Sequence, residues 1–305
     1  MLSEAQDSSA GNPQVKKALR WLVAMMHTDG TPARFNDCAP GIAPPMSELL
    51  RLGQSLNVPL PPPTASEGCQ MLSASGYVRM SRAGAVLLAD VAAIGTDYLP
   101  GHAHADTLSY ELEIAGMQLV VNRGTSEYGT GPQRQHERGT AAHSTVQLAE
   151  ADSSEVWAGF RVGRRARVHD LALSESNDGQ RSELRAAHDG YRFLPGAPRH
   201  HRRWRFESSS LHVEDTLSAV VEGVSRHHLA PELQLEPMGS GRWRVLDRRQ
   251  RTVAQLKVLA GTARAVPWQH AERFGTLVPA QTLEIKLAEG HAAVCWQWIP
   301  CTSSS

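Results

Sequence analysis

The stretch Gly101–Thr145 reads GHAHADTLSYELEIAGMQLVVNRGTSEYGTGPQRQHERGTAAHST, and it carries most of what the sequence says about the fold and the site. His102, His104 and Asp106 alternate along the chain, so in an extended strand all three would point to the same face. Two imidazoles and a carboxylate on one face are poorly suited to a hydrophobic core. They are well suited to a metal site or to polar catalysis.

Histidine is common in this chain, which contains 14, and most histidines in such a chain are structural or merely solvated. The H-x-H-x-D spacing followed by His143, beyond a predicted hairpin, favours a site more strongly. Zinc prefers two or three histidines and a carboxylate, with a short-spaced pair and a more distant ligand. The spacing alone leaves both interpretations open.

Beyond Gly76 the apolar pattern alternates, and short runs are joined by turns rich in Gly, Asp and Ser. This pattern predicts packed antiparallel sheets, a large β-sandwich, because no helix-length gaps separate the runs as they would in a parallel α/β sheet. The predicted strands are Gly76–Met80, Val86–Val91, Leu108–Ile114, Gln118–Asn122, Thr145–Leu148, Phe160–Val168, Arg202–Glu207, Leu211–Leu217, Trp243–Leu246, Val253–Val258, Thr282–Leu287 and Ala293–Trp298.

The amino-terminal part has a helical pattern instead. One apolar stripe follows Pro13 and a second follows Pro45, which predicts two helices. The segment from Val58 to Gly68, VPLPPPTASEG, contains three consecutive prolines that break both helix and sheet, so it marks a boundary. We therefore expect a helical segment over residues 1–57, a proline-rich linker over 58–75 and the β-sandwich over 76–305.

Charge and composition exclude several classes of function. Lys plus Arg and Asp plus Glu both number 31, and no Gly-rich phosphate loop is present, which argues against nucleic-acid or nucleotide binding. No apolar run approaches the roughly 20 residues of a membrane span. Arginines gather in GRRARV (163–168) and HHRRWRF (200–206), where they either attract an acidic polysaccharide or protect strand edges.

The four cysteines, Cys38, Cys69, Cys295 and Cys301, have no C-x-x-C spacing, so no zinc knuckle or redox motif is predicted. A disulfide between the last two stays open. The amino terminus, MLSEAQDSSAGNPQ, has no basic region or apolar core typical of a secretory signal. If the protein is exported, we expect a signal upstream of Met1.

The segments HAHADTLSYEL, VVNRGTSEY, RGTAAHSTV and SSEVWAGFRVGRRARV resemble, in this order, the C-terminal part of the heparinase II/III-like polysaccharide lyases, a superfamily that includes oligoalginate lyases. The resemblance extends from about Gly76 to about Glu214. Upstream, FNDCAPGIAPPMSELLRLG resembles the last helices of the toroid that precedes the β domain. The resemblance implies a mainly β chain, with a large antiparallel β-sandwich preceded by a short α-helical remnant of an (α/α) toroid.

The resemblance also implies a zinc site. The family binds Zn²⁺ through the second His of the H-x-H pair, an Asp on the next strand and the His of an H-N-T-V segment, which correspond to His104, Asn122 and His143. This chain has Asn in place of the Asp, and Ser144 follows the last histidine. An uncharged amide oxygen is a weaker zinc ligand than a carboxylate. Zinc on fewer ligands, recruitment of Asp106, and absence of zinc all stay open.

The catalytic residues follow by the same resemblance. The first His of the pair points into the substrate cleft in these lyases, which is His102 here, and a tyrosine takes part in proton transfer in some members, which corresponds to Tyr128. Arg138, Arg134 and His102 are expected to lower the pKa of this tyrosine from about 10. The remaining groups, an Asn or His and a second Tyr, come from the toroid, and residues 1–75 do not supply them convincingly.

The expected chemistry is β-elimination on a uronic-acid-containing glycan, such as a bacterial exopolysaccharide, alginate or a heparin-like chain. Such a lyase removes the proton at C5 and expels the oxygen at C4, which requires a base, an acid and groups that stabilise charge on the neighbouring carboxylate. The resemblance implies an acidic polysaccharide or oligosaccharide as partner and a place in the cell envelope or periplasm.

Two other functions stay open. Because the toroid is nearly absent, the chain could be a non-catalytic carbohydrate-binding or structural β module, with Trp157 as a platform for a sugar ring. A zinc hydrolase using His102, His104 and His143 is less favoured, since no H-E-x-x-H motif accompanies them. A lyase creates an ultraviolet-absorbing double bond, whereas a binding module retains the glycan unchanged.

Overall fold

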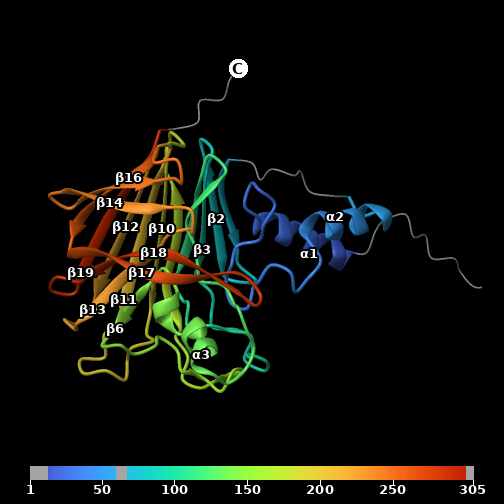
Figure 1. Cartoon of the computed structure of the whole chain (residues 1–305). Helices are drawn as coiled ribbons and strands as arrows, with labels where there is room; N and C mark the ends of the chain where they lie inside the picture. The colour runs from blue at the N-terminus through green and yellow to red at the C-terminus, as the bar shows by residue number, and fades with distance from the viewer. Residues whose placement is uncertain (1–12, 60–66, 300–305) are drawn as a thin grey trace, which may run out of the picture.

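The structure, a computed structural model, describes residues 13–59 and 67–299. It is mainly β, with antiparallel sheets packed against each other and a pair of helices beside them (Figure 1). The predicted fold class, an antiparallel β-sandwich preceded by a short helical segment, is confirmed.

Two large sheets form the sandwich. The five-stranded sheet contains, in order, β1 (Gly68–Leu72), β2 (Tyr77–Arg82), β3 (Ala85–Asp90), β4 (Tyr110–Ile114) and β5 (Met117–Val120). The eight-stranded sheet contains, in order, β14 (Gln234–Gly239), β15 (Arg242–Leu246), β16 (Thr252–Ala260), β19 (His291–Gln297), β12 (Ser210–Leu217), β11 (His200–Glu207), β10 (Arg181–His188) and β9 (Val168–Glu175).

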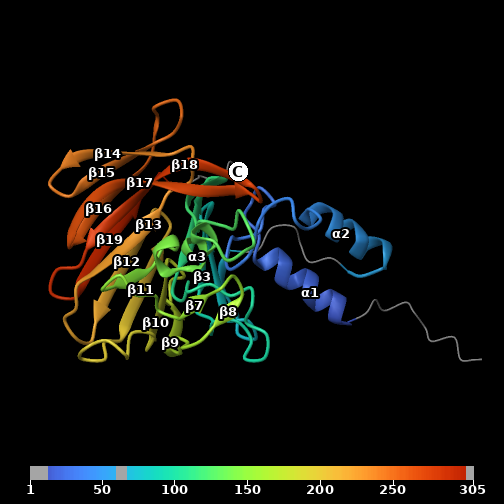
Figure 2. The ribbon, with the colours of Figure 1, turned by 60° about the horizontal axis from the view of Figure 1, so that its bottom comes forward.

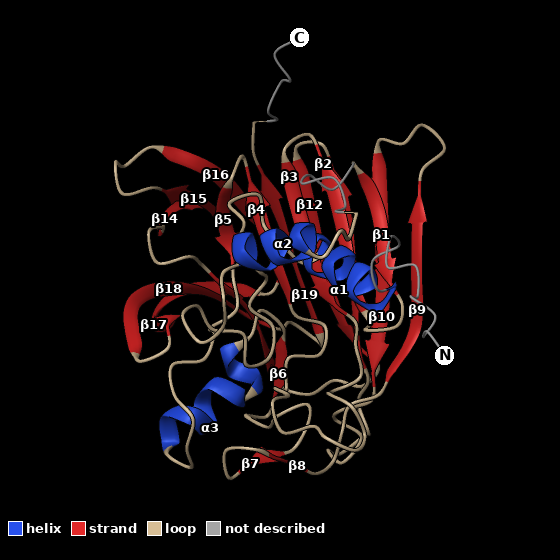
Figure 3. Cartoon of the chain, turned by 90° about the vertical axis from the view of Figure 1, so that its right-hand side faces the viewer, coloured by secondary structure: helices blue, strands red, loops and turns tan. Residues whose placement is uncertain are grey.

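Smaller elements cover one end of the sandwich. A four-stranded sheet contains, in order, β17 (Thr262–Arg273), β18 (Thr276–Lys286), β13 (Gly223–His228) and β6 (Val146–Leu148). The remaining elements are the hairpin of β7 (Val156–Trp157) and β8 (Arg161–Val162), the helix α3 (Pro132–Arg138) and the 3₁₀ turn η1 (Thr140–Ala142). They lie with several long loops below the two large sheets in Figure 3.

The helices α1 (Pro13–Ala24) and α2 (Met46–Ser55) lie across the face of the five-stranded sheet that points away from the eight-stranded sheet (Figure 3). Both begin close to the predicted positions. Proline suits the first turn of α1 because its fixed φ is helical and it lacks an N–H that would have no partner there.

The strand β3 is buried on both faces, which explains its continuous apolar sequence, AVLLAD. Leu87 belongs to the main core between the two large sheets. Val86 and Leu88 belong to a second core, which they share with Met25 and Phe35 from the amino-terminal segment. The helical segment is thus packed on the sandwich by its own apolar contacts.

The long β17–β18 hairpin reaches from its sheet toward the amino-terminal segment (Figure 2). Near its tip, the backbone N–H of Phe274 donates to the carbonyl of Pro40 at 3.4 Å, and that of Gly275 donates to the carbonyl of Ser126 at 2.7 Å. The hairpin therefore connects the carboxy-terminal half of the chain with the loop between the two helices and with the segment that follows β5.

Several predicted boundaries need correction. The predicted linker, 58–75, is shorter, because β1 occupies 68–72 and pairs with β2; residues 60–66 lie outside the described part. The strand predicted over Phe160–Val168 is wrong for most of its length. Only Arg161–Val162 (β8) and Val168, the first residue of β9, are strand in this range, and the backbone of Gly163 and Arg164 pairs locally with Glu155.

Two further expectations concern a disulfide and membrane-spanning helices. A disulfide between Cys295 and Cys301 is untested because Cys301 lies outside the described residues. In residues 13–59 and 67–299, no helix combines the length and the apolar character needed to cross a membrane.

Candidate functional site

The H-x-H-x-D segment is a loop between β3 and β4, so the prediction of one shared strand face is wrong. The backbone N–H of Ala105 donates to the carbonyl of Arg138 at 2.8 Å, which replaces pairing with a neighbouring strand. The side chain of His102 is 66 % exposed, whereas His104 and Asp106 are buried.

The carboxylate of Asp37, in the loop between α1 and α2, contacts side chains from several other segments of the site. Its Oδ2 lies 2.8 Å from Nδ1 of His102, and its Oδ1 lies 2.8 Å from Nε2 of His104. Both guanidinium Nη atoms of Arg134, in α3, donate to the same carboxylate, one of them at 2.7 Å to Oδ2. Thr125 Oγ1 donates to it at 3.1 Å.

Asp37 is ionised in this arrangement. Burial by itself would raise the pKa of the carboxyl group, but the hydrogen bonds and charges of His104 and Arg134 outweigh it and hold the pKa well below its usual range. A carboxylate that accepts this many donors is fixed in place. It also fixes the orientation of both imidazoles.

An exposed group of aromatic rings surrounds His102. Its imidazole lies 6.0 Å from the ring of Tyr128 and 5.7 Å from the ring of Phe160, measured between centroids. Tyr128 also contacts Phe274, at the tip of the β17–β18 hairpin, with 5.3 Å between centroids. Tyr128, Phe160 and Phe274 are 41 %, 42 % and 37 % exposed, and we call these three residues the aromatic rim.

The pKa of Tyr128 is raised, contrary to the expectation that positive charge lowers it. Partial burial and the negative charge of Asp37 raise it, and together they outweigh Arg134, whose guanidinium carbon lies 5.1 Å from the ring centroid. The reason is that Arg134 is paired with Asp37, so the positive charge of the arginine and the negative charge of the aspartate both act on the phenol. The phenol is therefore protonated over the physiological pH range.

Arg138, the third predicted catalytic residue, is fully buried at the end of α3. Its guanidinium donates to the carbonyl of Ala103, at 3.2 and 3.0 Å, and to the carbonyl of Trp157 at 3.2 Å. It thereby ties α3 to the loop between His102 and His104 and to the β7–β8 hairpin. A direct part in catalysis stays a prediction.

The three predicted zinc ligands lie together below this surface. The imidazoles of His104 and His143 are 5.3 Å apart between centroids, and both are buried. His143 Nδ1 lies 3.1 Å from Oδ1 of Asn122, whose Nδ2 donates to Glu111 Oε1 at 3.3 Å. Burial, together with the neighbouring histidines, lowers the pKa of His143 well below its usual value, so this imidazole is neutral.

Two buried nitrogen atoms in this group, Nδ1 of His104 and Nε2 of His143, have no hydrogen-bond partner. The other nitrogen of each ring is bonded to an oxygen of Asp37 or Asn122, so these two nitrogen atoms are the ones that could bind a metal ion. Two imidazoles on one tetrahedral zinc ion also place their centroids about 5 Å apart, given Zn–N bonds of about 2.0–2.1 Å.

Asn122 fits a zinc ion less well, because its amide oxygen already faces His143 and its amide nitrogen faces Glu111. Asp106 is directed elsewhere: its Oδ2 accepts the backbone N–H of Asn36 at 3.2 Å. Burial raises its pKa and that of its neighbour Asp90. Within the described residues, no group of three or more His, Cys, Asp or Glu side chains is placed to hold a metal ion.

Residues 1–75 contribute side chains to the site that the sequence did not predict. Besides Asp37, the side chain of Asn36 accepts the backbone N–H of His104 at 3.2 Å and donates to the hydroxyl of Tyr77 at 2.9 Å. Asn36 has φ of +55°, in the left-handed region that asparagine tolerates. The sequence offers only the Asn-Asp pair in the turn-rich loop ARFNDCAPG. A loop of this composition does not indicate that its side chains are buried in a site.

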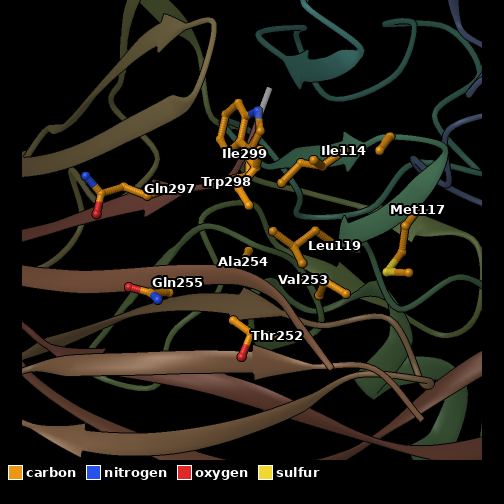
Figure 4. Close-up of a pocket in the computed structure, with 11 residues that line it drawn as sticks. Ile114, Met117, Leu119, Thr252, Val253, Ala254, Gln255, Gln297, Trp298 and Ile299 are labelled. Atoms are coloured by element: carbon orange, nitrogen blue, oxygen red, sulfur yellow. The ribbon is translucent and has the colours of Figure 1, made fainter. Parts of the chain in front are cut away.

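A cavity of about 600 Å³ opens beside Asp37, between the helical segment and β2. Aromatic side chains contribute to its lining, among them Trp21, Phe35 and Tyr77. A second hollow of about 600 Å³ lies between β5, β16 and the end of β19, and none of the site residues lines it (Figure 4).

The model of the family described as Heparinase II/III-like, C-terminal matches residues 64–298. No curated protein matches the sequence.

Solved structures share the fold. A heparinase III is 14 % identical and superposes with a TM-score of 0.72, covering 95 % of this chain and 46 % of its own. A heparan sulfate lyase from Pedobacter heparinus is 14 % identical with a TM-score of 0.70, covering 93 % of this chain and 46 % of its own. The chain thus spans slightly under half the length of these structures.

Proposed function

Because the chain belongs to the heparinase II/III-like C-terminal family, we propose that it takes part in β-elimination on a uronic-acid-containing glycan. The partner would be an acidic polysaccharide or oligosaccharide. The observation that carries the proposal is the exposed imidazole of His102, held by Asp37 at 2.8 Å, with the ring of Tyr128 at 6.0 Å.

His102 is proposed as the base. The ionised carboxylate of Asp37 accepts the proton on Nδ1, so the lone pair of the neutral imidazole is on Nε2. The His102 side chain is 66 % exposed, and this leaves it accessible to a sugar ring. Nε2 would take the proton from C5, and the electron pair of that C–H bond would become the new C4–C5 double bond.

Tyr128 is proposed as the acid. Its raised pKa keeps the phenol protonated, which suits a group that donates its proton to the leaving oxygen at C4. The oxygen departs with the electron pair of its bond to C4, so electrons and protons balance. Because His102 and Tyr128 lie side by side, both transfers would occur on one side of the sugar.

The aromatic rim would orient the glycan. Exposed aromatic rings offer flat apolar faces that suit the C–H faces of sugar rings. Trp157, in the β7–β8 hairpin, is 44 % exposed and offers a further ring of this kind. The rim thereby places a sugar beside the base and the acid.

We propose that Zn²⁺, when bound, is held by Nδ1 of His104 and Nε2 of His143, with Asn122 orienting His143. The ion would supply fixed positive charge beneath the loop that carries His102 and would stiffen that loop. The elimination described above uses only the groups of the protein. For a protein acting on polysaccharide we also propose a place in the cell envelope or periplasm, which fractionation of the source cells would test.

The test is an ultraviolet assay for the C4–C5 double bond, with purified chain and a panel of alginate, an unsulfated glucuronate polymer and heparan sulfate. We expect His102→Ala to abolish turnover while the circular dichroism spectrum is unchanged. His169→Ala, a change at an exposed histidine of β9, is the matched control and should keep full turnover. Full turnover by His102→Ala would remove this residue from the mechanism.

A non-catalytic carbohydrate-binding role is the second candidate function, and the exposed aromatic rim favours it, since stacking alone retains a glycan. In that case the chain would bind a glycan of the panel without any gain in absorbance. Tyr128→Ala would then weaken binding, whereas His102→Gln would leave it unchanged.

A further inference from the structure

The arginines of HHRRWRF separate onto the two faces of β11. Arg203 and Arg205 face outward, where they pair with Glu214 and Glu183. Arg202 faces inward and is 1 % exposed, between the two large sheets. A buried guanidinium is costly unless every donor finds a partner, so its surroundings indicate what it does.

All five N–H donors of Arg202 have an acceptor. Nε donates to Asp215 Oδ1 at 2.6 Å, and Nη2 donates to Asp215 Oδ2 at 2.9 Å and to Ser225 Oγ at 3.2 Å. Nη1 donates to two backbone carbonyl oxygens, that of Leu108 at 2.8 Å and that of Ser144 at 2.6 Å. No other common side chain presents five donors in this rigid fork.

The two carbonyl groups belong to the segments that carry the site histidines. Ser144 directly follows His143, and Leu108 lies near the end of the loop that carries His102 and His104. Arg202 therefore joins, through one nitrogen atom, two backbone segments that are 36 residues apart in the sequence. A second hydrogen bond, from Thr145 Oγ1 to the carbonyl of Thr107 at 3.0 Å, joins the same two segments.

The backbone conformation of Leu108 shows that the connection between these two segments is constrained. Its φ is +63°, a left-handed conformation that is rare and unfavourable for a bulky residue. Such a conformation persists only where the surroundings enforce it. The hydrogen bond from Arg202 to the carbonyl of this residue is one of the contacts that do so.

Asp215 anchors the arginine from the opposite side. Besides Arg202, it accepts hydrogen bonds from Ser225 Oγ at 2.7 Å and from His200 Nε2 at 2.7 Å. Burial by itself would raise the pKa of Asp215, but the charge of Arg202 and the hydrogen bonds from His200 and Arg202 hold it far below its usual range. The guanidinium is thus fixed to β11 and β12, which belong to the rigid eight-stranded sheet.

We infer that Arg202 is a positioning residue, which sets the spacing between the His104-bearing and the His143-bearing segments by holding both to the eight-stranded sheet. The positional part of this inference stands on the geometry alone. Its catalytic consequence, that the His102 loop is correctly placed against the aromatic rim, rests on the proposed lyase function.

The test compares Arg202→Lys with two controls. Lysine keeps the charge but cannot reach Asp215 and both carbonyl groups together. Arg203→Lys changes the neighbouring, outward-facing arginine, and Ser225→Ala removes an acceptor while both carbonyl contacts remain. The readout is the imidazole ¹⁵N NMR spectrum of metal-free protein at neutral pH, which distinguishes the two neutral tautomers of each histidine.

We expect the His143 signals to shift or to split in Arg202→Lys, because the Nδ1 hydrogen bond to Asn122 loses its fixed geometry. They should match wild type in both controls, and the signals of His212, on the outer face of β12, should be unchanged in all variants. A folded Arg202→Lys protein with wild-type His143 signals overturns the inference. If that variant does not fold, the same NMR comparison is made with Asp215→Asn, which keeps the arginine. Shifted His143 signals then support the inference, and wild-type signals overturn it.

The activity assay then tests the consequence. Displacement of reacting groups by about 1 Å lowers rates about 100-fold, so we expect kcat of Arg202→Lys to fall by about that factor with KM within about twofold. An unchanged kcat in a folded variant refutes the catalytic consequence. A wild-type chain without turnover refutes the lyase proposal instead, while the NMR comparison still decides the positional inference.

Discussion

The carboxylate of Asp37 lies 2.8 Å from Nδ1 of His102, although the two residues are 65 positions apart. The first belongs to the loop between the two amino-terminal helices and the second to a loop of the five-stranded sheet. The contact means that the short helical segment completes the site and does not merely precede it.

Asp37→Asn tests this contact. The variant loses the charge that pairs with the fully buried Arg134, and breaking a buried ion pair typically costs about 3–5 kcal/mol. We expect a decrease of that order in the free energy of unfolding in urea, and loss of any lyase activity because His102 is no longer oriented. Asp97→Asn, at an exposed carboxylate paired with Arg165, should change neither quantity measurably.

Tyr128→Phe tests the acid. The phenylalanine ring keeps the contacts with Phe160 and Phe274, so we expect KM to change little while kcat falls about 100-fold or more. Since the tyrosine pKa is raised above about 10 and the acid acts while protonated, the rate of the wild type should not fall on the alkaline side until the pH exceeds that value. A fall near neutral pH would assign the acid to another group.

Asn122→Asp tests the metal assignment. A carboxylate at this position faces Glu111, so the metal-free variant should be less stable than wild type by about 1–3 kcal/mol. The added charge should in turn raise zinc affinity, measured by titration calorimetry and by elemental mass spectrometry of protein purified without added metal. Asn177→Asp, in the exposed β9–β10 turn, is the control. Equal zinc affinity in both variants would show that residue 122 is not near the ion.

His27 provides a prediction for alkaline pH. Burial alone would lower its pKa, but hydrogen bonds to Glu111 and Glu113, at 2.8 and 3.1 Å, outweigh burial and raise the pKa to about 9. Since the folded pKa lies above the unfolded value of about 6.5, the stabilisation is complete below that value and is lost as the pH rises through about 9. It amounts to about 3 kcal/mol at most.

The measurement is urea unfolding at a series of pH values between about 6 and 10 for wild type and His27→Gln. The variant should lack the part of the decrease that His27 causes. His270→Gln is a matched control, because burial and the nearby charges of Arg34 and Arg123 lower its pKa to about 3, so that it stays neutral throughout. A His27→Gln curve parallel to that of wild type would refute the assignment.

The sequence was most informative where one face of a strand is apolar. The runs at β2, β3, β11, β12 and β19 were predicted because their inward residues alternate or are continuously apolar. It was least informative at β9 (VHDLALSE), which is largely exposed at the sheet edge and has no such pattern. The helix α3 was missed because its polar residues, PQRQHER, pair through tertiary contacts instead of forming an apolar stripe.

For the site, the family resemblance implied that His104, Asn122 and His143 come together, and these three side chains are neighbours in the structure. The sequence could not predict Asp37, since the pairing of that residue with His102 and His104 depends on how the amino-terminal loop packs on the sheet. Nor could it predict which arginines of HHRRWRF are buried. Alternation separates the two faces of a strand but does not say which face meets the core.

The double burial of β3 has a consequence for how the protein folds. Val86 and Leu88 are covered only when the amino-terminal segment, with Met25 and Phe35, packs against them. A shortened chain that starts at Gly68 would turn this apolar face to water and would be prone to self-association. The helices and the sandwich should therefore melt in a single cooperative transition, as one folding unit despite the prolines between them.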